Sequence, residues 1–340
     1  MYGLGEGRVV VGCGGFTCQD AEMPPHACAV DPDGLARWCL EHLGSPPAEE
    51  IFRSGHLSAV IGLRLADGRE VVVKVRPAAP RIAVCVEVQR RLFQAGYPCP
   101  EPLTGAAPFG GDIATAEVYI PGGSVLPGAD VAAAAFAEAF ARLIRLVPSP
   151  AEVSALAPAP SWAAWNHAGN GLWPRSEDSD VDLDEVSGAE WIDDAGRRAR
   201  DRLRIGASGA VIGHCDWLAD NLRWSGDTLQ VVHDWDSVTA DSEDVLVGFA
   251  AALYSTIDAD KLATVEDTRR FLVAYGHARG RDLSADELHR AWAAGVWTRA
   301  YDAKFQHATG RPITSLSEDE ARERLRRAGT PPDELTRATR

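Results

Sequence analysis

The chain has 340 residues, which exceeds an average single domain, so two domains or two lobes are expected. Hydrophobic residues make up 46% and charged residues 24%, the proportions of a soluble globular protein and not of a disordered one. The net charge of −15 argues against nucleic acid as the main partner, because binding phosphates requires a basic face, and it suits a cationic small molecule.

The N-terminal residues do not resemble a signal peptide. Residues 1–30 lack a basic n-region and a long apolar h-region, and no stretch approaches the roughly 20 apolar residues of a membrane span. The seven cysteines are odd in number and include no CxxC pair, which disfavours zinc and a disulfide scaffold. We therefore expect a cytoplasmic, reduced protein, monomeric or homodimeric, with an N-terminal extension and no membrane partner.

The next residues have the pattern of a small, β-rich first lobe over 31–120. IFRSG, AVIGLRLA and REVVVKVR predict strands, and Asp67-Gly68 between the last two is a strong hairpin signal. Apolar residues at four-residue spacing predict a helix over 80–95, and two further strands are expected near 102–106 and 112–120. The result is an antiparallel five-stranded sheet with one helix.

A second, mainly helical lobe is predicted over 121–340. Glycine and proline in IPGGSVLPG mark its start, and residues 148–188 look irregular. Two short apolar runs, 209–213 and 229–233, predict one β-hairpin. The ranges with helical periodicity are 131–147, 189–204, 245–256, 264–278, 284–306 and 317–328. The predicted fold class is therefore α+β with two lobes.

One lysine stands out in the first lobe. Lys74 occupies the middle of VVVKV, and the whole chain has only three lysines. On a strand it either faces solvent or points into the space between the lobes. Glu87 is the only acid between Lys74 and Pro100, and a Lys–Glu pair that bridges strand and helix would fix the lysine for holding an anion.

Polar residues end both runs of the predicted hairpin. HCDWLADN contains Asp216 and Asn221, and VVHDWD contains Asp234. A hairpin brings its strand ends together, so Asn221 and Asp234 can meet, and one carboxylate with one amide oxygen is a usual Mg²⁺ site that phosphates complete. Asp216 would accept a proton from a substrate hydroxyl. The alternative is an ordinary turn with exposed acids.

The motif HxDxxxxN at His214, Asp216 and Asn221, followed by a strand that ends on Asp234, resembles the aminoglycoside phosphotransferase and choline kinase superfamily. The resemblance covers about residues 50–305 and implies a protein-kinase-like fold. It also implies ATP (or GTP) and Mg²⁺ as cofactors, a first lobe that binds the nucleotide, and a phosphotransferase activity on an alcohol group. Asp216 would be the catalytic base, His214 would orient its loop, and Asn221 and Asp234 would ligate Mg²⁺.

The same resemblance implies the nucleotide contacts. Lys74 would contact the α- and β-phosphates, and Glu87 would position it. A turn from Gly55 to Ser58 would cover the phosphates. Backbone groups that would hold the adenine belong to Glu117, Val118 and Tyr119.

The chain departs from the family pattern at two positions of the motif. Cys215 replaces the usual glycine, and Asp220 stands where glycine often precedes the metal-binding asparagine. Aspartate tolerates a left-handed backbone better than most residues, so we expect the turn at Asp220 to survive. Asp236 is interpreted as a surface residue and not as a second metal contact.

The sequence indicates the molecule that accepts the phosphoryl group less clearly than it indicates the nucleotide site. Residues 176–194 hold nine acids and no lysine or arginine, which would attract a polycationic antibiotic such as an aminoglycoside or would form a solvated acidic loop. Nearby tryptophans would stack on a sugar or cation, or pack in the core; they are Trp162, Trp165, Trp173 and Trp191.

Other functions stay open. A choline-like or homoserine-like amine, a peptide or nucleoside antibiotic, or a metabolic sugar would suit the same chemistry. A nucleotide-binding pseudoenzyme with a regulatory role is the alternative from another class. The short sequence DWD would also suit a sugar-nucleotide transferase, although that interpretation leaves HxDxxxxN unexplained.

Overall fold

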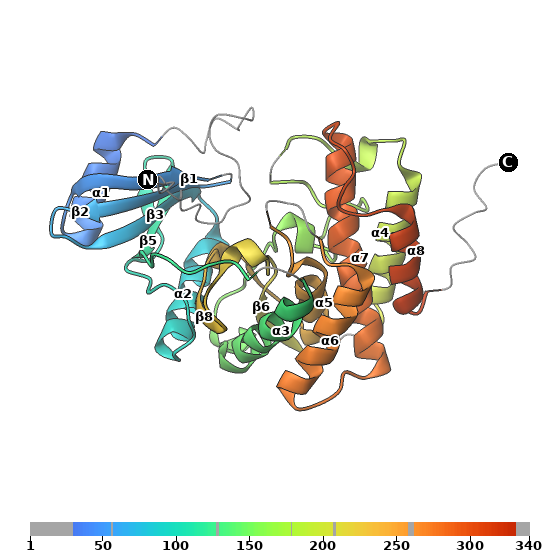
Figure 1. The fold of residues 1–340 in the computed structure, drawn as a ribbon. Coiled ribbons are helices and arrows are strands. Elements are labelled where there is room, and N and C mark those ends of the chain that lie inside the picture. Colours follow the sequence, from blue (N-terminus) through green and yellow to red (C-terminus); the bar gives the residue numbers. More distant parts are fainter. Residues whose placement is uncertain are drawn as a thin grey trace, which may run out of the picture. The chain divides into compact units, whose positions relative to one another are not determined.

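The computed structural model describes residues 30–55, 57–126, 129–177, 179–206, 209–257 and 262–330 (Figure 1). The predicted extension over 1–30 lies outside these residues except for Val30. The chain forms two compact units, which interleave along the sequence and are described separately. Unit 1 comprises Met1–Ala79, Pro98–Val125 and Asp220–Asp234, and unit 2 comprises Pro80–Tyr97, Leu126–Ala219 and Trp235–Arg340.

Unit 1 contains an antiparallel five-stranded sheet, as the sequence predicts. Its strands are β1 (Pro47–Ser54), β2 (Ala59–Leu65), β3 (Glu70–Pro77), β4 (Ala107–Phe109) and β5 (Asp112–Val118), in the spatial order β1-β2-β3-β5-β4. The β2–β3 hairpin turns at Gly68, whose φ of 89° suits glycine. The strand expected at 102–106 is wrong: β4 begins at Ala107, and Pro102, which has no N–H to donate, forms only an isolated bridge with Glu117.

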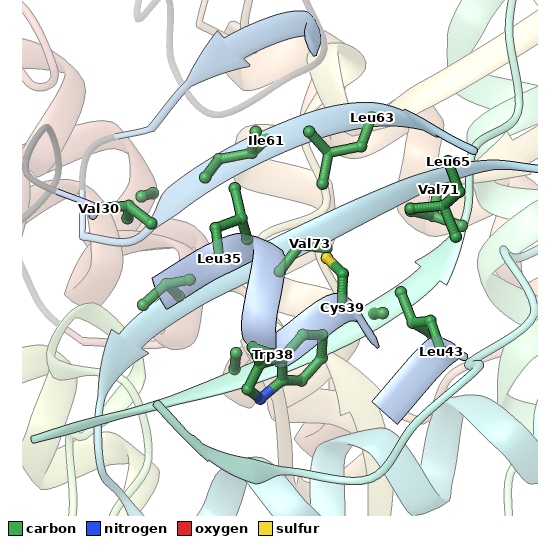
Figure 2. Packing of buried hydrophobic residues seen from close by; sticks show 14 residues of the cluster. Val30, Leu35, Trp38, Cys39, Leu43, Ile61, Leu63, Leu65, Val71 and Val73 are labelled. Carbon is green, nitrogen blue, oxygen red and sulfur yellow. The ribbon is translucent and has the colours of Figure 1, made fainter. Parts of the chain in front are cut away.

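Helix α1 (Pro32–Leu43) covers one face of this sheet, and the sequence analysis did not predict it. Asp31 caps its first turn by accepting from two backbone N–H groups, and Gly44 ends it with a φ of 75°. Figure 2 shows Leu35, Trp38, Cys39 and Leu43 of α1 beside strand residues such as Ile61, Leu63, Val71 and Val73, all of them buried. This packing leaves the opposite face of the sheet for polar side chains.

The predicted single hairpin is replaced by two separate strand pairs. In unit 1, β7 (Leu222–Ser225) pairs with β8 (Thr228–Val232) around a turn at Gly226. In unit 2, β6 (Ala210–His214) pairs with β9 (Val238–Ser242). The prediction that 209–213 pairs with 229–233 is therefore wrong, because each run finds a partner that the apolar pattern did not mark as a strand.

Unit 2 is mainly helical, and its helices fall within one to two residues of the predicted ranges at most ends. They are α2 (Pro80–Gln94), α3 (Ala129–Leu146), α4 (Glu190–Leu203), α5 (Glu243–Leu253), α6 (Val265–Arg279), α7 (Ala285–Ala308) and α8 (Glu318–Arg327) (Figure 1). Three short 3₁₀ turns interrupt residues 148–188: Pro150–Glu152, Ser161–Ala163 and Leu183–Glu185. Among the described residues, no helix has the length and apolar character to cross a membrane.

A buried ion pair ties α5 to α7 inside unit 2. Arg290 Nε donates to Asp244 Oδ2 at 2.6 Å, and both side chains are almost fully buried. The same guanidinium group donates to the carbonyls of Leu203 and Ile205 and to Ser242 Oγ. Each of the three guanidinium nitrogens therefore donates to at least one acceptor, which is the condition for keeping a charge in the interior.

We expect Asp244→Ala to lower the free energy of unfolding by about 3–5 kcal/mol, because it leaves the Arg290 charge buried without its counter-ion. Denaturant unfolding followed by circular dichroism measures this difference. The matched control is Arg322→Ala, which removes an exposed pair with Asp319 and should leave the unfolding midpoint nearly unchanged. Equal effects of the two variants would contradict the prediction.

Candidate active site

Lys74 lies on the polar face of the unit 1 sheet. In the β3–β5 register Lys74 stands opposite Thr115, and Glu117 follows two residues later on the same face. Lys74 Nζ lies 3.8 Å from Glu117 Oε1 and 3.8 Å from Asp234 Oδ1. The three side chains are only 9%, 10% and 16% exposed, so Lys74 is not a solvated strand lysine.

Asn221 and Asp234 flank the open end of the β7–β8 hairpin. The backbone N–H of His233 donates to the Asn221 carbonyl at 2.8 Å, so the two chain segments run side by side there. Asn221 is almost fully buried. The hairpin that ends beside Asn221 and Asp234 is β7–β8 and not the predicted pairing, and a joint metal site of the two side chains stays a prediction.

The left-handed backbone expected at Asp220 occurs instead at Asp234. Asp220 belongs to a 3₁₀ turn (Ala219–Asn221), and its carbonyl accepts from Arg223 Nη1 at 2.8 Å. Asp234 has a φ of 63° and is the one non-glycine residue with positive φ in the part of the chain that the structure describes. Such a conformation is uncommon and concentrates at functional sites, and aspartate tolerates it.

His233 and Cys99 of unit 1 lie near Glu117 of the Lys74 cluster, and the sequence analysis did not single them out. Burial lowers the pKa of His233 to about 4, despite the opposing charge of Glu117, so its imidazole is neutral at pH 7. Burial, and then the charge of Glu117, raise the pKa of the Cys99 thiol to about 12. No sequence signal marked Glu117 as a side chain near Lys74, because the two residues are 43 positions apart and meet only through strand register.

The proposed catalytic loop lies in unit 2, directly after β6. The backbone N–H of Asp216 donates to His214 Nδ1 at 3.3 Å, and its carbonyl accepts from Leu218. His214 is fully buried and packs edge-on against Trp217 and Trp235. The contact gives His214 the geometry needed to orient the loop that carries Asp216, which is half-buried.

Cys215 fixes the same loop from its other side. Its backbone N–H donates to the Ser237 carbonyl at 2.9 Å, and its thiol lies 2.8 Å from the same oxygen. The side chain is fully buried, and burial raises its pKa well above the ordinary value for a thiol. Cys215 is therefore a packing residue and a poor nucleophile.

The segment between β1 and β2 contains Gly55 and Ser58, and His56 between them lies outside the described residues. Its predicted role of covering the phosphates stays a prediction. Gly55 has a φ of 140°, and a Cβ atom there would lie 1.8 Å from the Ser58 carbonyl oxygen, so only glycine fits. On β5 and just after it, the N–H groups of Val118 and Tyr119 donate to the carbonyls of Glu101 and Glu70. Any adenine contact would have to use other backbone groups of this segment.

Glu87 lies on α2 of unit 2 and has partners of its own. Its carboxylate accepts from Arg91 Nε at 2.8 Å and from Arg90 Nη1 at 3.2 Å. The Arg91 hydrogen bond is the main cause of a lowered Glu87 pKa. The predicted role of Glu87 as the partner of Lys74 stays a prediction.

The carboxylates of the acidic segment 176–194 are largely engaged within unit 2. Asp184 accepts from the backbone N–H groups of Leu172 and Trp173. Asp193 accepts from Trp173 Nε1 at 2.7 Å and from Lys304 Nζ at 2.8 Å. Trp165 and Trp173 are buried, as core packing predicts, whereas Trp162 and Trp191 are half-buried.

The unit 1 cluster fits a divalent cation and a phosphate. Asn221 and Asp234 offer one amide oxygen and one carboxylate, and Mg²⁺ typically takes one or two such protein ligands and completes its shell with water and phosphate oxygens. No group of three or more His, Cys, Asp or Glu that suits a metal occurs within the described ranges. The Lys74 ammonium group beside Asp234 would supply a positive charge for the same phosphates.

Comparisons with known proteins identify a family for the chain. A family model described as the phosphotransferase enzyme family matches residues 50–294. No curated protein matches the chain.

Three solved structures show a similar fold at low identity. The amicoumacin kinase hAmiN, in complex with AMP-PNP, Ca²⁺ and amicoumacin, is 13% identical with a TM-score of 0.56 over 86% of this chain and 92% of its own. The phosphotransferase APH(4)-Ia, in complex with ADP and hygromycin B, is 12% identical with a TM-score of 0.53 over 87% and 97%. A choline/ethanolamine kinase family protein from Mesorhizobium loti is 16% identical with a TM-score of 0.50 over 88% and 94%.

Proposed function

The chain belongs to the phosphotransferase enzyme family, and on this premise we propose that it transfers the γ-phosphoryl group of ATP to a hydroxyl group of a small molecule. The observation that supports this most directly is the buried contact between Lys74 and Asp234, with Asn221 on the adjoining arm of the same hairpin. A lysine and two metal-type oxygen ligands in one buried cluster match the requirements of a nucleotide phosphate site.

In this proposal each residue has one role in an in-line phosphoryl transfer. Lys74 neutralises charge on the α- and β-phosphates, and a divalent cation held by Asn221 and Asp234 would neutralise the β- and γ-phosphates. Asp216 accepts the proton of the acceptor hydroxyl while its oxygen bonds to the γ-phosphorus. The bond from that phosphorus to the oxygen it shares with the β-phosphate breaks, and ADP leaves.

His214 and Cys215 act on this step by holding the loop that carries Asp216. The His214 ring accepts a hydrogen bond from the Asp216 backbone N–H, and the Cys215 backbone N–H donates to the Ser237 carbonyl. Alignment and charge neutralisation provide most of the rate enhancement in such transfers, because little covalent chemistry is asked of the protein. Fixed loop geometry is therefore what the enzyme needs from these residues.

We further propose that the acceptor is a polyhydroxylated, cationic compound, such as an aminoglycoside or another antibiotic, which would make the protein a resistance factor in the cytoplasm. The net charge of −15 supports a cationic acceptor. The acidic segment lends less support, since Asp184 and Asp193 already hold the fold together. A metabolic amine or sugar is the alternative within the same chemistry.

An acceptor screen tests the proposal. We expect the purified protein with ATP and Mg²⁺ to add one phosphoryl group, about 80 Da, to at least one compound in a panel of cationic antibiotics, choline-like amines and neutral sugars, detected by mass spectrometry. The control is the Asp216→Asn variant with the same panel. Nucleotide binding without any product would favour the regulatory pseudoenzyme, and the absence of nucleotide binding would overturn the proposal as a whole.

A further inference from the structure

The ammonium group of Lys74 has a carboxylate partner that belongs to its own sheet. Glu117 Oε1 lies 3.8 Å from Lys74 Nζ, and both side chains are at least nine-tenths buried. In the β3–β5 ladder Glu117 is the diagonal neighbour of Lys74, two residues beyond the directly opposed Thr115. Diagonal neighbours on one face of an antiparallel pair are within reach of long side chains. The backbone hydrogen bonds of the sheet therefore fix this pair.

The acid that the family resemblance implies as the lysine partner has arginine partners of its own. Glu87 lies on α2, in unit 2, and its carboxylate accepts hydrogen bonds from two guanidinium groups, those of Arg90 and Arg91. Its charge is thus already balanced, and its side chain is 40% exposed. Glu117 is far more buried, at 10%.

Helix α2 is also anchored to the segment that follows Asp234. Arg81 Nη1 donates to the Asp236 carbonyl at 2.7 Å, and Arg81 Nη2 donates to the Val238 carbonyl at 2.6 Å. Both acceptors belong to unit 2. These contacts fix the first turn of α2 within unit 2.

The second carboxylate beside Lys74 has another task in the proposed function. Asp234 lies 3.8 Å from Lys74 Nζ, but as a metal ligand it would share its charge with a divalent cation, which would repel the ammonium group. Glu117 would then be a carboxylate beside Lys74 that binds no metal, and it belongs to the same sheet as the lysine. We propose that Glu117 is the positioning residue for Lys74 in nucleotide binding, an inference that rests on the proposed function and deepens it.

The test compares nucleotide binding by calorimetry, with ADP alone and with ADP and Mg²⁺, across single variants. We expect Glu117→Gln to weaken ADP binding about tenfold or more and to raise the KM for ATP, because a misplaced lysine loses its phosphate contact. The matched control in the same sheet is Glu49→Gln, an exposed acid paired with Arg64, which should bind ADP like the wild type. A Glu87→Gln effect equal to or larger than that of Glu117→Gln would overturn the inference.

A double-variant cycle separates positioning from folding. If Glu117 acts through Lys74, Glu117→Gln should weaken ADP binding in the wild-type background and have little further effect in a Lys74→Met background. Full additivity would contradict the inference. If Glu117→Gln fails to fold, Glu117→Asp replaces it, because aspartate keeps the charge on a shorter side chain. We expect Glu117→Asp to weaken ADP binding while its thermal unfolding midpoint stays near that of the wild type. Wild-type affinity for ADP in this variant would overturn the inference.

The outcomes also distinguish this inference from the proposed function. If the wild type binds ADP and Glu117→Gln binds it equally well, only the positioning role fails. If the wild type binds neither ADP nor ATP, the proposed function fails with it.

Discussion

Asp234→Asn is expected to reduce phosphoryl transfer by about 1,000-fold or more. The substitution removes the carboxylate that would hold the divalent cation. Neutralisation of the phosphates by that cation would be worth several kcal/mol, and about 1.4 kcal/mol corresponds to a factor of ten in rate. Asparagine tolerates the left-handed backbone of Asp234, with its φ of 63°, so this substitution changes the charge without straining the chain. Steady-state kinetics over a range of Mg²⁺ concentrations measures the loss.

Asp236→Asn is the matched control for this experiment. Asp236 lies two residues further on, in a 3₁₀ turn (Trp235–Ser237), and contributes its backbone carbonyl to Arg81. Asp236 is half-buried and not the exposed surface residue expected from the sequence. The substitution keeps its size and that carbonyl, so activity within about threefold of the wild type is expected. Activity retained by Asp234→Asn would contradict its assignment as a metal ligand, and an equal loss in both variants would point to a general charge effect.

Asp216→Asn is expected to lower kcat by about 10²–10⁴-fold while leaving nucleotide affinity within about twofold of the wild type. The amide cannot accept the hydroxyl proton, but it keeps the size of the side chain. The backbone contacts of Asp216 to His214 and Leu218 are unaffected by the substitution. Kinetics with the acceptor from the screen, together with ADP calorimetry, separates the two quantities.

The same loop offers a control for Asp216→Asn. Asp220 uses its backbone carbonyl to accept from Arg223, and Asp220→Asn keeps that group, so near-normal turnover is expected. An equal loss of turnover in Asp216→Asn and Asp220→Asn would contradict a specific role of Asp216 as proton acceptor.

Local signals in the sequence predicted most of the secondary structure. Asp67-Gly68 encoded the β2–β3 hairpin, because its turn conformation depends on two adjacent residues. Helical periodicity located helices such as α4, whose buried residues recur at three- and four-residue spacing. Even α1 carried its own signals in Asp31, Pro32 and Gly44, so its omission was a failure of interpretation and not of information.

Strand partners could not be predicted in the same way. The run 209–213 pairs with 238–242, a segment that contains Thr239 and Asp241 and lacks a clear apolar pattern. The run 229–233 pairs with a strand of only four residues, β7. Short strands with polar residues give weak signals, and which strands pair is decided by burial of the whole unit.

The sequence by itself determined the residue types and short spacings of the site: the histidine, aspartate and asparagine of HxDxxxxN, the aspartate that ends a strand, and a lysine within a β-strand. Only the tertiary structure decided which carboxylate meets Lys74, since Glu117 reaches it through the register of β3 and β5. The physical reason is that turns, caps and helical faces depend on neighbouring residues, whereas contacts between distant residues depend on backbone hydrogen bonds formed only when the sheet assembles.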